Sequence, residues 1–175
     1  SDGAACMLLV GEELASSFTD DPLHVVGLGQ GSGRGLHAAD DLTYFEATRT
    51  AAQEAYQMAD LSPADVQFAE VHDCFTIAEL IEYEAMGLAK PGQGARVVEE
   101  GLTEKNGKLP VNPSGGLKSK GHPIGATGVS MHVLTSMQLT GEAGGIQVKD
   151  ARLGGIFNMG GAAVANYVSI LERIK

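Results

Sequence analysis

The seventeen-residue segment 112–128 limits the possible folds of this chain more than any other stretch. It contains five glycines and two prolines, so it cannot form the interior of a helix or of a central strand. Apolar residues at helical spacing follow it up to Gly141, namely Ala126, Val129, Val133 and Met137. The sequence therefore predicts a tight, specified loop that leads into an amphipathic helix.

His122 lies in this loop, next to Pro123 and just before the predicted helix N-terminus. Free backbone N–H groups at a helix N-terminus favour negative charge, so an imidazole and an anion-stabilising field meet at one place. That combination favours a catalytic role. The alternative interpretation is a structural helix entry with an incidental histidine, and these residues alone leave both interpretations open.

The composition excludes several classes of protein. A chain of 175 residues suffices for one domain with its own core, and its formal net charge of -10 argues against nucleic acid as a partner. No apolar run reaches the roughly 20 residues that span a bilayer, and acidic residues interrupt the apolar segment near the N-terminus, so neither a membrane span nor a signal peptide is predicted. Two cysteines predict no disulfide framework, and the expected location is the cytoplasm.

Five short apolar segments are predicted as strands. The last two are joined by residues 158–161, a connection that fits an antiparallel pair and not a parallel one. The five segments are residues 6–10, 24–28, 66–71, 152–157 and 163–170. With helices between the strands, they predict an α/β domain with a mixed sheet and no internal domain boundary.

Two capping boxes predict where helices begin. Thr43 with Glu46 precedes a stripe of small and apolar residues, and Thr76 with Glu79 precedes a second helix that stops at Gly87. The second helix is expected to bury Ile77, Leu80, Ile81 and Ala85. The polar, glycine-containing segment 89–110 is predicted to be a long surface loop.

Glycines occupy every second position from Gly29 to Gly35, directly after the second predicted strand. This spacing differs from the dinucleotide-binding fingerprint G-x-G-x-x-G, so no dinucleotide site is predicted here. The chain has 24 glycines that cluster without a repeat, which indicates that several backbone segments approach another group closely.

A second chemically informative stretch is His-Asp-Cys-Phe at residues 72–75, between the predicted strand 66–71 and the helix after it. Reacting groups of open α/β sheets lie at such carboxyl ends of strands. A thiol beside a helix N-terminus can have its pKa lowered below about 8.5, so Cys74 is a candidate acid/base or nucleophile. The alternatives are a buried structural cysteine, or a zinc site made by His72, Cys74 and His122.

Three segments resemble the thiolase superfamily. Residues 112–128, Asn-Pro-Ser-Gly-Gly-Leu-Lys-Ser-Lys-Gly-His-Pro-Ile-Gly-Ala-Thr-Gly, resemble a long signature of its C-terminal half. Residues 72–75 are similar to the motif of sterol-carrier-protein-type thiolases and of archaeal and bacterial acetyl-CoA acetyltransferases. Residues 1–5 resemble the end of the family's N-terminal half. The resemblance thus covers residues 1–175 as a thiolase C-terminal-type domain, with residues 1–15 similar to the end of the other half.

This resemblance implies roles for four residues. His122 matches the histidine that lines the first oxyanion hole and activates the nucleophile, and His72 matches the other donor of that hole. Cys74 matches the acid/base that takes the α-proton. Gly160 matches the glycine whose backbone N–H belongs to the second oxyanion hole. Preorganised donors suit a Claisen step, because negative charge develops on thioester oxygens.

Two positions depart from the family pattern. Asn158 stands where other thiolases carry their acid/base cysteine, which is expected in the subgroup whose acid/base matches Cys74. The nucleophilic cysteine belongs to the family's N-terminal half, and Cys6 does not match it. The chain is therefore expected to contribute oxyanion holes and an acid/base without the nucleophile, and to be inactive alone.

The resemblance implies a thiolase-type αβα layered domain with a five-stranded mixed sheet. It also implies the C-terminal half of an acyltransferase that makes or cleaves β-ketoacyl-CoA. The alternatives are half of a carbon–carbon lyase of the steroid-CoA retro-aldolase type, or a non-catalytic thiolase-like subunit. No metal and no permanently bound cofactor are expected, and coenzyme A thioesters are the expected substrates. The expected partners are the N-terminal half, on the same or a separate polypeptide, further copies of the chain, and an OB-fold companion protein.

Overall fold

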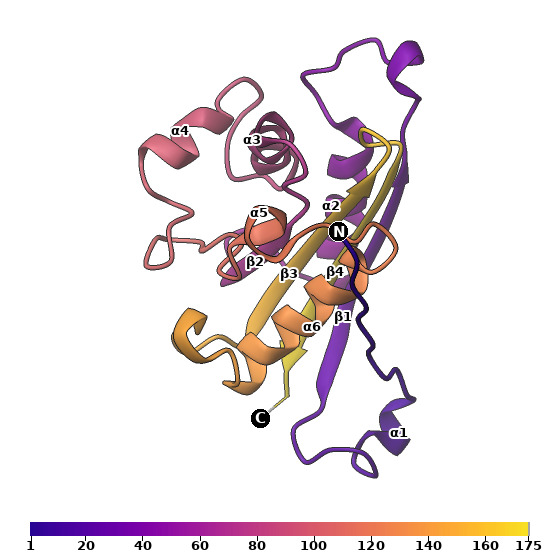
Figure 1. The fold of residues 1–175 in the computed structure, drawn as a ribbon, viewed down its shortest axis with the longest axis vertical. Helices are drawn as coiled ribbons and strands as arrows, with labels where there is room; N and C mark the ends of the chain where they lie inside the picture. Colours follow the sequence, from indigo (N-terminus) through magenta and orange to yellow (C-terminus); the bar gives the residue numbers. More distant parts are fainter. Residues whose placement is uncertain (175) are drawn as a thin grey trace.

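A mixed four-stranded sheet lies at the centre of the computed structural model, which describes residues 1–174 (Figure 1). The strand order is β1-β4-β3-β2, and the strands are β1 (Leu23–Ser32), β2 (Phe68–Val71), β3 (Leu153–Gly160) and β4 (Ala165–Arg173). β4 pairs antiparallel with both β1 and β3, whereas β2 pairs parallel with β3. The predicted mixed sheet and the antiparallel pairing of the last two strands are confirmed.

The predicted fifth strand, residues 6–10, is wrong. This segment has no regular secondary structure and is followed by the short helix α1 (Glu12–Ala15). Met7, Leu8 and Leu9 are 40%, 66% and 68% exposed. A strand needs a neighbouring strand for its backbone hydrogen bonds, and none among residues 1–174 pairs with this segment. The sheet therefore has four strands and not five.

Helices cover both faces of the sheet, which gives the predicted αβα layers. α2 (Glu46–Ala59) packs against β1 and β4 on one face, and α6 (Thr127–Thr140) packs against β3, β2 and β4 on the other. Figure 1 shows α6 crossing in front of the strands. One apolar cluster lies between the sheet and α2 and contains Phe157 and Ile170, and a second lies between the sheet and α6 and contains Phe68 and Ile156.

The alternating glycines belong to β1 itself, because the strand runs to Ser32 and does not end near residue 28 as predicted. Gly27, Gly29 and Gly31 all face α2, where an added Cβ would overlap the carbonyl oxygens of Ala55, Ala51 and Ala47 respectively. Strand and helix backbones can approach this closely only without side chains between them. The glycine series is therefore a packing surface for α2.

Other helices correct the predictions for the middle of the chain. Segment 89–110 contains α4 (Gly94–Glu99) with Val97 buried, so it is not simply a surface loop. A five-residue helix, α5 (Gly116–Lys120), interrupts the glycine-rich loop 112–128. Two 3-10 helices, Leu36–Ala38 and Gly144–Ile146, complete the secondary structure of the described chain.

Neither predicted capping box forms. Phe45 and Phe75 are the N-cap residues of α2 and α3 (Thr76–Ala85), and neither N-cap side chain makes a capping hydrogen bond. Thr43 lies two residues too early and donates to Asp41, while the carboxylate of Glu79 accepts from Tyr83. The predicted burial of Ile77 is also wrong, since this side chain is 61% exposed.

Candidate active site

The end of β2 fixes the position of His72. The backbone N–H of His72 donates to the carbonyl oxygen of Phe157 on β3 at 3.0 Å. The N–H of Val71, one residue earlier, donates to Oδ1 of Asn112 at 2.8 Å. The residue is 6% exposed, so its side chain is enclosed by neighbouring elements, and the backbone bond to Phe157 fixes its main chain.

The glycine-rich loop 112–128 is tied along β2 by side-chain bonds. Oγ of Ser114 donates to Glu70 at 2.7 Å, and the backbone N–H of Leu117 at the start of α5 donates to Asp73 at 2.8 Å. Asn112 has a left-handed backbone with φ 48° and donates its N–H to the carbonyl oxygen of Ala69. These bonds bring the loop that carries His122 to the end of β2.

The two histidines meet as a direct ring contact. The ring centroids of His72 and His122 are 4.9 Å apart with an interplanar angle of 78°. Nδ1 of His122 lies 2.7 Å from Oγ1 of Thr127, and that hydroxyl donates to the carbonyl oxygen of Pro123 at 3.1 Å. Because its hydrogen is used there, the hydroxyl accepts from Nδ1–H of His122. In the neutral imidazole, Nε2 of His122 is therefore free to accept a proton.

His72 has a partner on β3. Its Nδ1 lies 3.0 Å from Oδ1 of Asn158, so Nδ1 carries the proton in this arrangement. Burial lowers the pKa of His72, and the nearby His122 lowers it further. His72 is thus held as a neutral imidazole. The reversed amide orientation of Asn158 would instead donate to Nδ1 and place the proton of His72 on Nε2.

Cys74 lies between the end of β2 and α3 and is half-buried. It packs against an apolar cluster made by Ala78, Met159 and Ala163. Burial raises the pKa of the Cys74 thiol, and the carboxyl group of Glu82 raises it further. The expectation of a lowered pKa is therefore wrong, because the hydrogen bond from the backbone N–H of Phe75 lowers it less than burial raises it. The resting group is a thiol.

Gly160 ends β3 at the same edge of the sheet. It is exposed and has open space where a side chain would be. The preceding Met159 packs with Cys74, and Asn158 holds His72. The structure thus gathers His72, His122, Cys74 and Gly160 at the carboxyl ends of the parallel strands β2 and β3.

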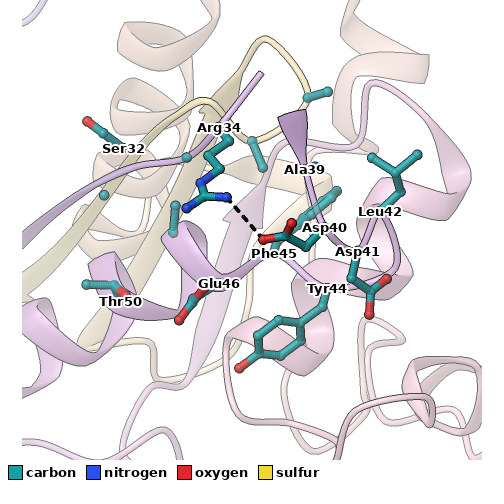
Figure 2. Close-up of a pocket in the computed structure, with 15 residues that line it drawn as sticks. Ser32, Arg34, Ala39, Asp40, Asp41, Leu42, Tyr44, Phe45, Glu46 and Thr50 are labelled. Carbon is teal, nitrogen blue, oxygen red and sulfur yellow. Dashed lines mark hydrogen bonds and ion pairs between the residues drawn. The ribbon is translucent and has the colours of Figure 1, made fainter. Parts of the chain in front are cut away.

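A cavity of about 400 Å³ adjoins this edge (Figure 2). It lies between the end of β1, the loop before α2 and the β3–β4 turn, and Arg34 pairs with Asp40 across it at 3.1 Å. Phe45 and Ala163 line the cavity and also belong to the cluster that contacts Cys74. This cavity was not predicted from the sequence, although the glycines near residue 33 form one of its walls.

Two buried carboxyl groups beneath the site were also missed. Glu82 is 0% exposed, and neither of its carboxylate oxygens has a hydrogen-bond partner among the described residues. Burial raises the pKa of Glu82 well above its usual value. Burial likewise raises the pKa of Glu70 to about 7, against the bonds from Ser114. The burial of Glu82 could have been suspected from the sequence, because Glu82 lies between Ile81 and Ala85 of the expected apolar stripe.

Within residues 1–174 no three His, Cys, Asp or Glu side chains are grouped as a metal site requires, so the zinc alternative at His72, Cys74 and His122 has no support. The same part of the chain contains no helix that is long and apolar enough to cross a bilayer.

The chain is an αβα domain in which His72 and Cys74 follow β2, and His122 meets His72 from the loop before α6. The sequence profile described as "Thiolase C-terminal domain-like" matches residues 30–173. The chain belongs to this family.

Curated relatives and a solved structure agree with this assignment. The chain is 44% identical to an acetyl-CoA acetyltransferase of Methanothermobacter thermautotrophicus over 174 residues, which are 99% of this chain and 45% of the relative. It is 40% identical to sterol carrier protein 2 of Bos taurus over 171 residues, or 94% of this chain and 32% of the relative. The chain thus spans less than half the length of either relative.

The structure of an Ltp2-ChsH2(DUF35) aldolase superposes with a TM-score of 0.81 at 24% sequence identity. The match covers 93% of this chain and 42% of that chain. At this identity the likeness is one of fold.

Proposed function

We propose that the chain is the C-terminal half of a thiolase-like acyltransferase that condenses acyl-CoA thioesters or cleaves β-ketoacyl-CoA by thiolysis. The observation that carries the proposal is the contact between His72 and His122, 4.9 Å between ring centroids, at the carboxyl ends of parallel strands. The similarity to an acetyl-CoA acetyltransferase over 99% of this chain supports it.

His122 has the chemistry to activate a nucleophile. Since Thr127 accepts from Nδ1–H, Nε2 can take the proton of a cysteine thiol supplied by the complementary half. The resulting thiolate attacks the thioester carbonyl carbon, and the bond to the sulfur of coenzyme A breaks. The new Nε2–H of His122 then donates to the oxygen that gains negative charge.

Cys74 is proposed to move the proton on the α-carbon. In condensation, its thiolate form takes the α-proton of acetyl-CoA, and the resulting carbanion attacks the carbonyl carbon of the acyl-enzyme. The bond from that carbon to the nucleophilic cysteine then breaks and releases this cysteine as a thiolate. In thiolysis, its thiol returns a proton to the carbon that leaves as acetyl-CoA. The raised pKa of Cys74 keeps the thiol form populated, which is the form that returns the proton in thiolysis.

His72 and Gly160 are proposed as hydrogen-bond donors to thioester oxygens. For His72 to donate from Nε2, Asn158 must present its NH₂ group to Nδ1, and the 3.0 Å separation permits this arrangement. The open space at Gly160 leaves room for a substrate oxygen to approach the backbone.

The complementary half is proposed to cover an exposed apolar surface beside the site. Phe75, Ile77 and Ile124 are 72%, 61% and 83% exposed. Leu8 and Leu9 in the N-terminal segment are also exposed, which supports the assignment of residues 1–15 to the end of the other half. Self-association, an OB-fold companion and a cytoplasmic location remain predictions.

The test compares this chain alone with a complex that includes the complementary half. The complex should release a burst of coenzyme A from acetyl-CoA, and the chain alone should release none, because no acyl-enzyme can form without the nucleophile. His122→Ala in the complex should slow acylation by about 10²–10³-fold, the usual cost of a lost oxyanion donor. Stoichiometric acetylation of Cys74 in the isolated chain would contradict the assigned roles.

The second candidate is half of a thiolase-fold carbon–carbon lyase. A retro-aldol cleavage can also use the Cys74 thiol as an acid, and it needs no acyl-enzyme. In the complex, replacement of the nucleophilic cysteine should abolish acyl transfer if the first candidate is right. A lyase would keep its activity after that replacement.

A further inference from the structure

The turn between β3 and β4 has an unusual backbone. Ala162 and Ala163 are consecutive residues with φ 55° and 63°, in the left-handed region that glycine tolerates and L-residues with a Cβ disfavour. A pair of such residues persists only where surrounding contacts hold it. The turn follows directly on Gly160, the proposed donor of the second oxyanion hole.

The side chain of Asn166 supplies that support. Asn166 is 0% exposed. Its Nδ2 donates to the carbonyl oxygen of Ala163 at 2.8 Å and to that of Gly31 at 3.2 Å. Its Oδ1 accepts from the hydroxyl of Thr48 at 2.7 Å. One amide thus joins the β3–β4 turn to β1 and to α2.

The end of β1 holds the same turn from the other side. The backbone N–H of Gly33 donates to the carbonyl oxygen of Val164 at 2.8 Å. An added Cβ on Gly33 would overlap the carbonyl oxygen of Ala163. The turn is therefore fixed to β1 through both a side-chain and a backbone bond.

The turn forms one wall of the candidate site. The side chain of Ala163 is buried in the cluster that contacts Cys74 and Met159. Asn166 pairs directly with Met159 across the β3–β4 ladder, one rung from Gly160. A displacement of Ala163 would move both the surroundings of Cys74 and the backbone at Gly160.

We propose that Asn166 is a positioning residue for the second oxyanion hole and acts through the carbonyl oxygen of Ala163. This inference rests on the proposed function. It assigns a role to a residue whose side-chain hydrogen bonds go to Thr48, Gly31 and Ala163 and to none of the four candidate site residues.

The first measurement is amide hydrogen exchange of residues 160–164, which does not depend on activity. Asn166→Ala should speed exchange in this turn at least tenfold. Tyr56→Phe is the matched control, because it also deletes a buried hydrogen bond made by α2, here to the carbonyl oxygen of Met86 at 3.2 Å. The control should leave exchange in the turn unchanged. Equal exchange rates in the two variants would overturn the proposal.

The second measurement is steady-state kinetics of the complex with the complementary half. Asn166→Ala should lower kcat at least tenfold and leave KM within twofold, because oxyanion donors act mainly in the transition state. Tyr56→Phe should change neither value. A faster-exchanging turn with unchanged kcat would overturn the proposal. If the unmutated complex transfers no acyl group, the proposed function fails, and the exchange data still decide whether Asn166 holds the turn.

Asn166→Asp is a second variant that tests the proposal if Asn166→Ala does not fold. It keeps the shape and the acceptor for Thr48, but an ionised carboxylate cannot donate to the carbonyl oxygens of Ala163 and Gly31. Protonation restores one donor. The amide chemical shifts of residues 160–163 should therefore return toward those of the unmutated protein as the pH falls. Shifts that do not depend on pH, or that match the unmutated protein throughout, would overturn the proposal.

Discussion

The chemistry of Cys74 depends on an environment that opposes ionisation. Its position before α3 suggested a lowered pKa, but burial and Glu82 raise it instead. The protein therefore holds a proton at Cys74 until a base or a substrate draws it away.

Cys74→Ser should slow α-proton exchange into acetyl-CoA by about 10²–10⁴-fold in the complete enzyme, because a hydroxyl has a much higher pKa than a thiol and its deprotonated form is hardly populated. Burst-phase acylation should be much less affected. Deuterium exchange and the burst are measured on the same variant, with Cys6→Ser at an exposed position as control. Exchange at the unmutated rate would leave Cys74 as a packed core thiol.

Glu70 makes stability depend on pH. Burial raises its pKa from 4.5 to about 7, so the folded protein keeps a proton that the unfolded chain has already released between these values. The free energy of unfolding should therefore fall as the pH rises through this window, by up to about 3 kcal/mol. Glu70→Gln should remove this part of the pH dependence.

Urea unfolding at pH 4.5, 6 and 8 measures the effect as the difference between the unmutated protein and Glu70→Gln. Glu99→Gln at an exposed position of α4 is the control and should follow the unmutated protein. Parallel pH profiles for the unmutated protein and Glu70→Gln would contradict the prediction.

At the scale of elements, the contact between β1 and α2 depends on missing side chains. An added Cβ on Gly29 would overlap the carbonyl oxygen of Ala51 and lie 3.0 Å from the backbone nitrogen of Ala55. These are backbone atoms and cannot move aside as a flexible side chain can. The strand and helix must separate or bend to accept a methyl group there.

Gly29→Ala should lower the free energy of unfolding by about 1–3 kcal/mol, the usual range for overpacking. Gly35→Ala is a matched control from the same glycine series, since its φ is -61° and an added Cβ would contact nothing within 4 Å. Urea unfolding midpoints compare the two variants. If Gly35→Ala were destabilised and Gly29→Ala were not, the glycines of β1 would not be the packing surface for α2.

The sequence could predict those elements whose cause is local. The helix that follows His122 forms and ends before Gly141, whose φ is 79°, as expected. Its predicted apolar face of Ala126, Val129, Val133 and Met137 is wrong, because the residues that α6 buries are Thr127, Met131, Thr135, Gln138 and Leu139. Residues 6–10 look like a strand, but a strand exists only with a partner, and pairing is a tertiary property. The glycines of β1 were misjudged for the same reason, because the sequence does not show which helix lies against them. The role of Asn166 could not be predicted from the sequence, since an asparagine in a strand can make many different hydrogen bonds.

The candidate site could be predicted in part. His72 could be expected at the edge of the sheet where the carboxyl ends of parallel strands lie. His122 reaches that edge on loop 112–128, which bonds from Ser114 to Glu70 and from Leu117 to Asp73 hold in place. The tautomers of the two histidines and the raised pKa of Cys74 could not be predicted from the sequence. They depend on Asn158, Thr127 and Glu82, which reach the site from other elements.

At the scale of the whole molecule, α6 and the surface beside the site suggest an incomplete assembly. The helix carries no Asp, Glu, Lys or Arg along its 14 residues. A helix without charges is usually enclosed by other elements. With Phe75 and Ile124 exposed nearby, this supports the proposal that the complementary half covers this side.

Ile124→Lys should weaken association with the complementary half at least tenfold, because it places a charge in an apolar interface. Val98→Lys on α4 is the control, since Val98 is also exposed at 52% but lies outside the site. Sedimentation velocity on mixtures of the two halves measures the binding. Equal affinities for both variants would place the interface elsewhere.

The parallel register of β2 and β3 restricts how this site can diversify. Val71 pairs with Phe157, so His72 and Asn158 follow on the next rung. A one-residue insertion or deletion within β2 would turn every side chain to the opposite face and present a neighbour of His72 to Asn158 instead. A substitution at His72 or Asn158 keeps this register, whereas an insertion or deletion in β2 separates the two side chains.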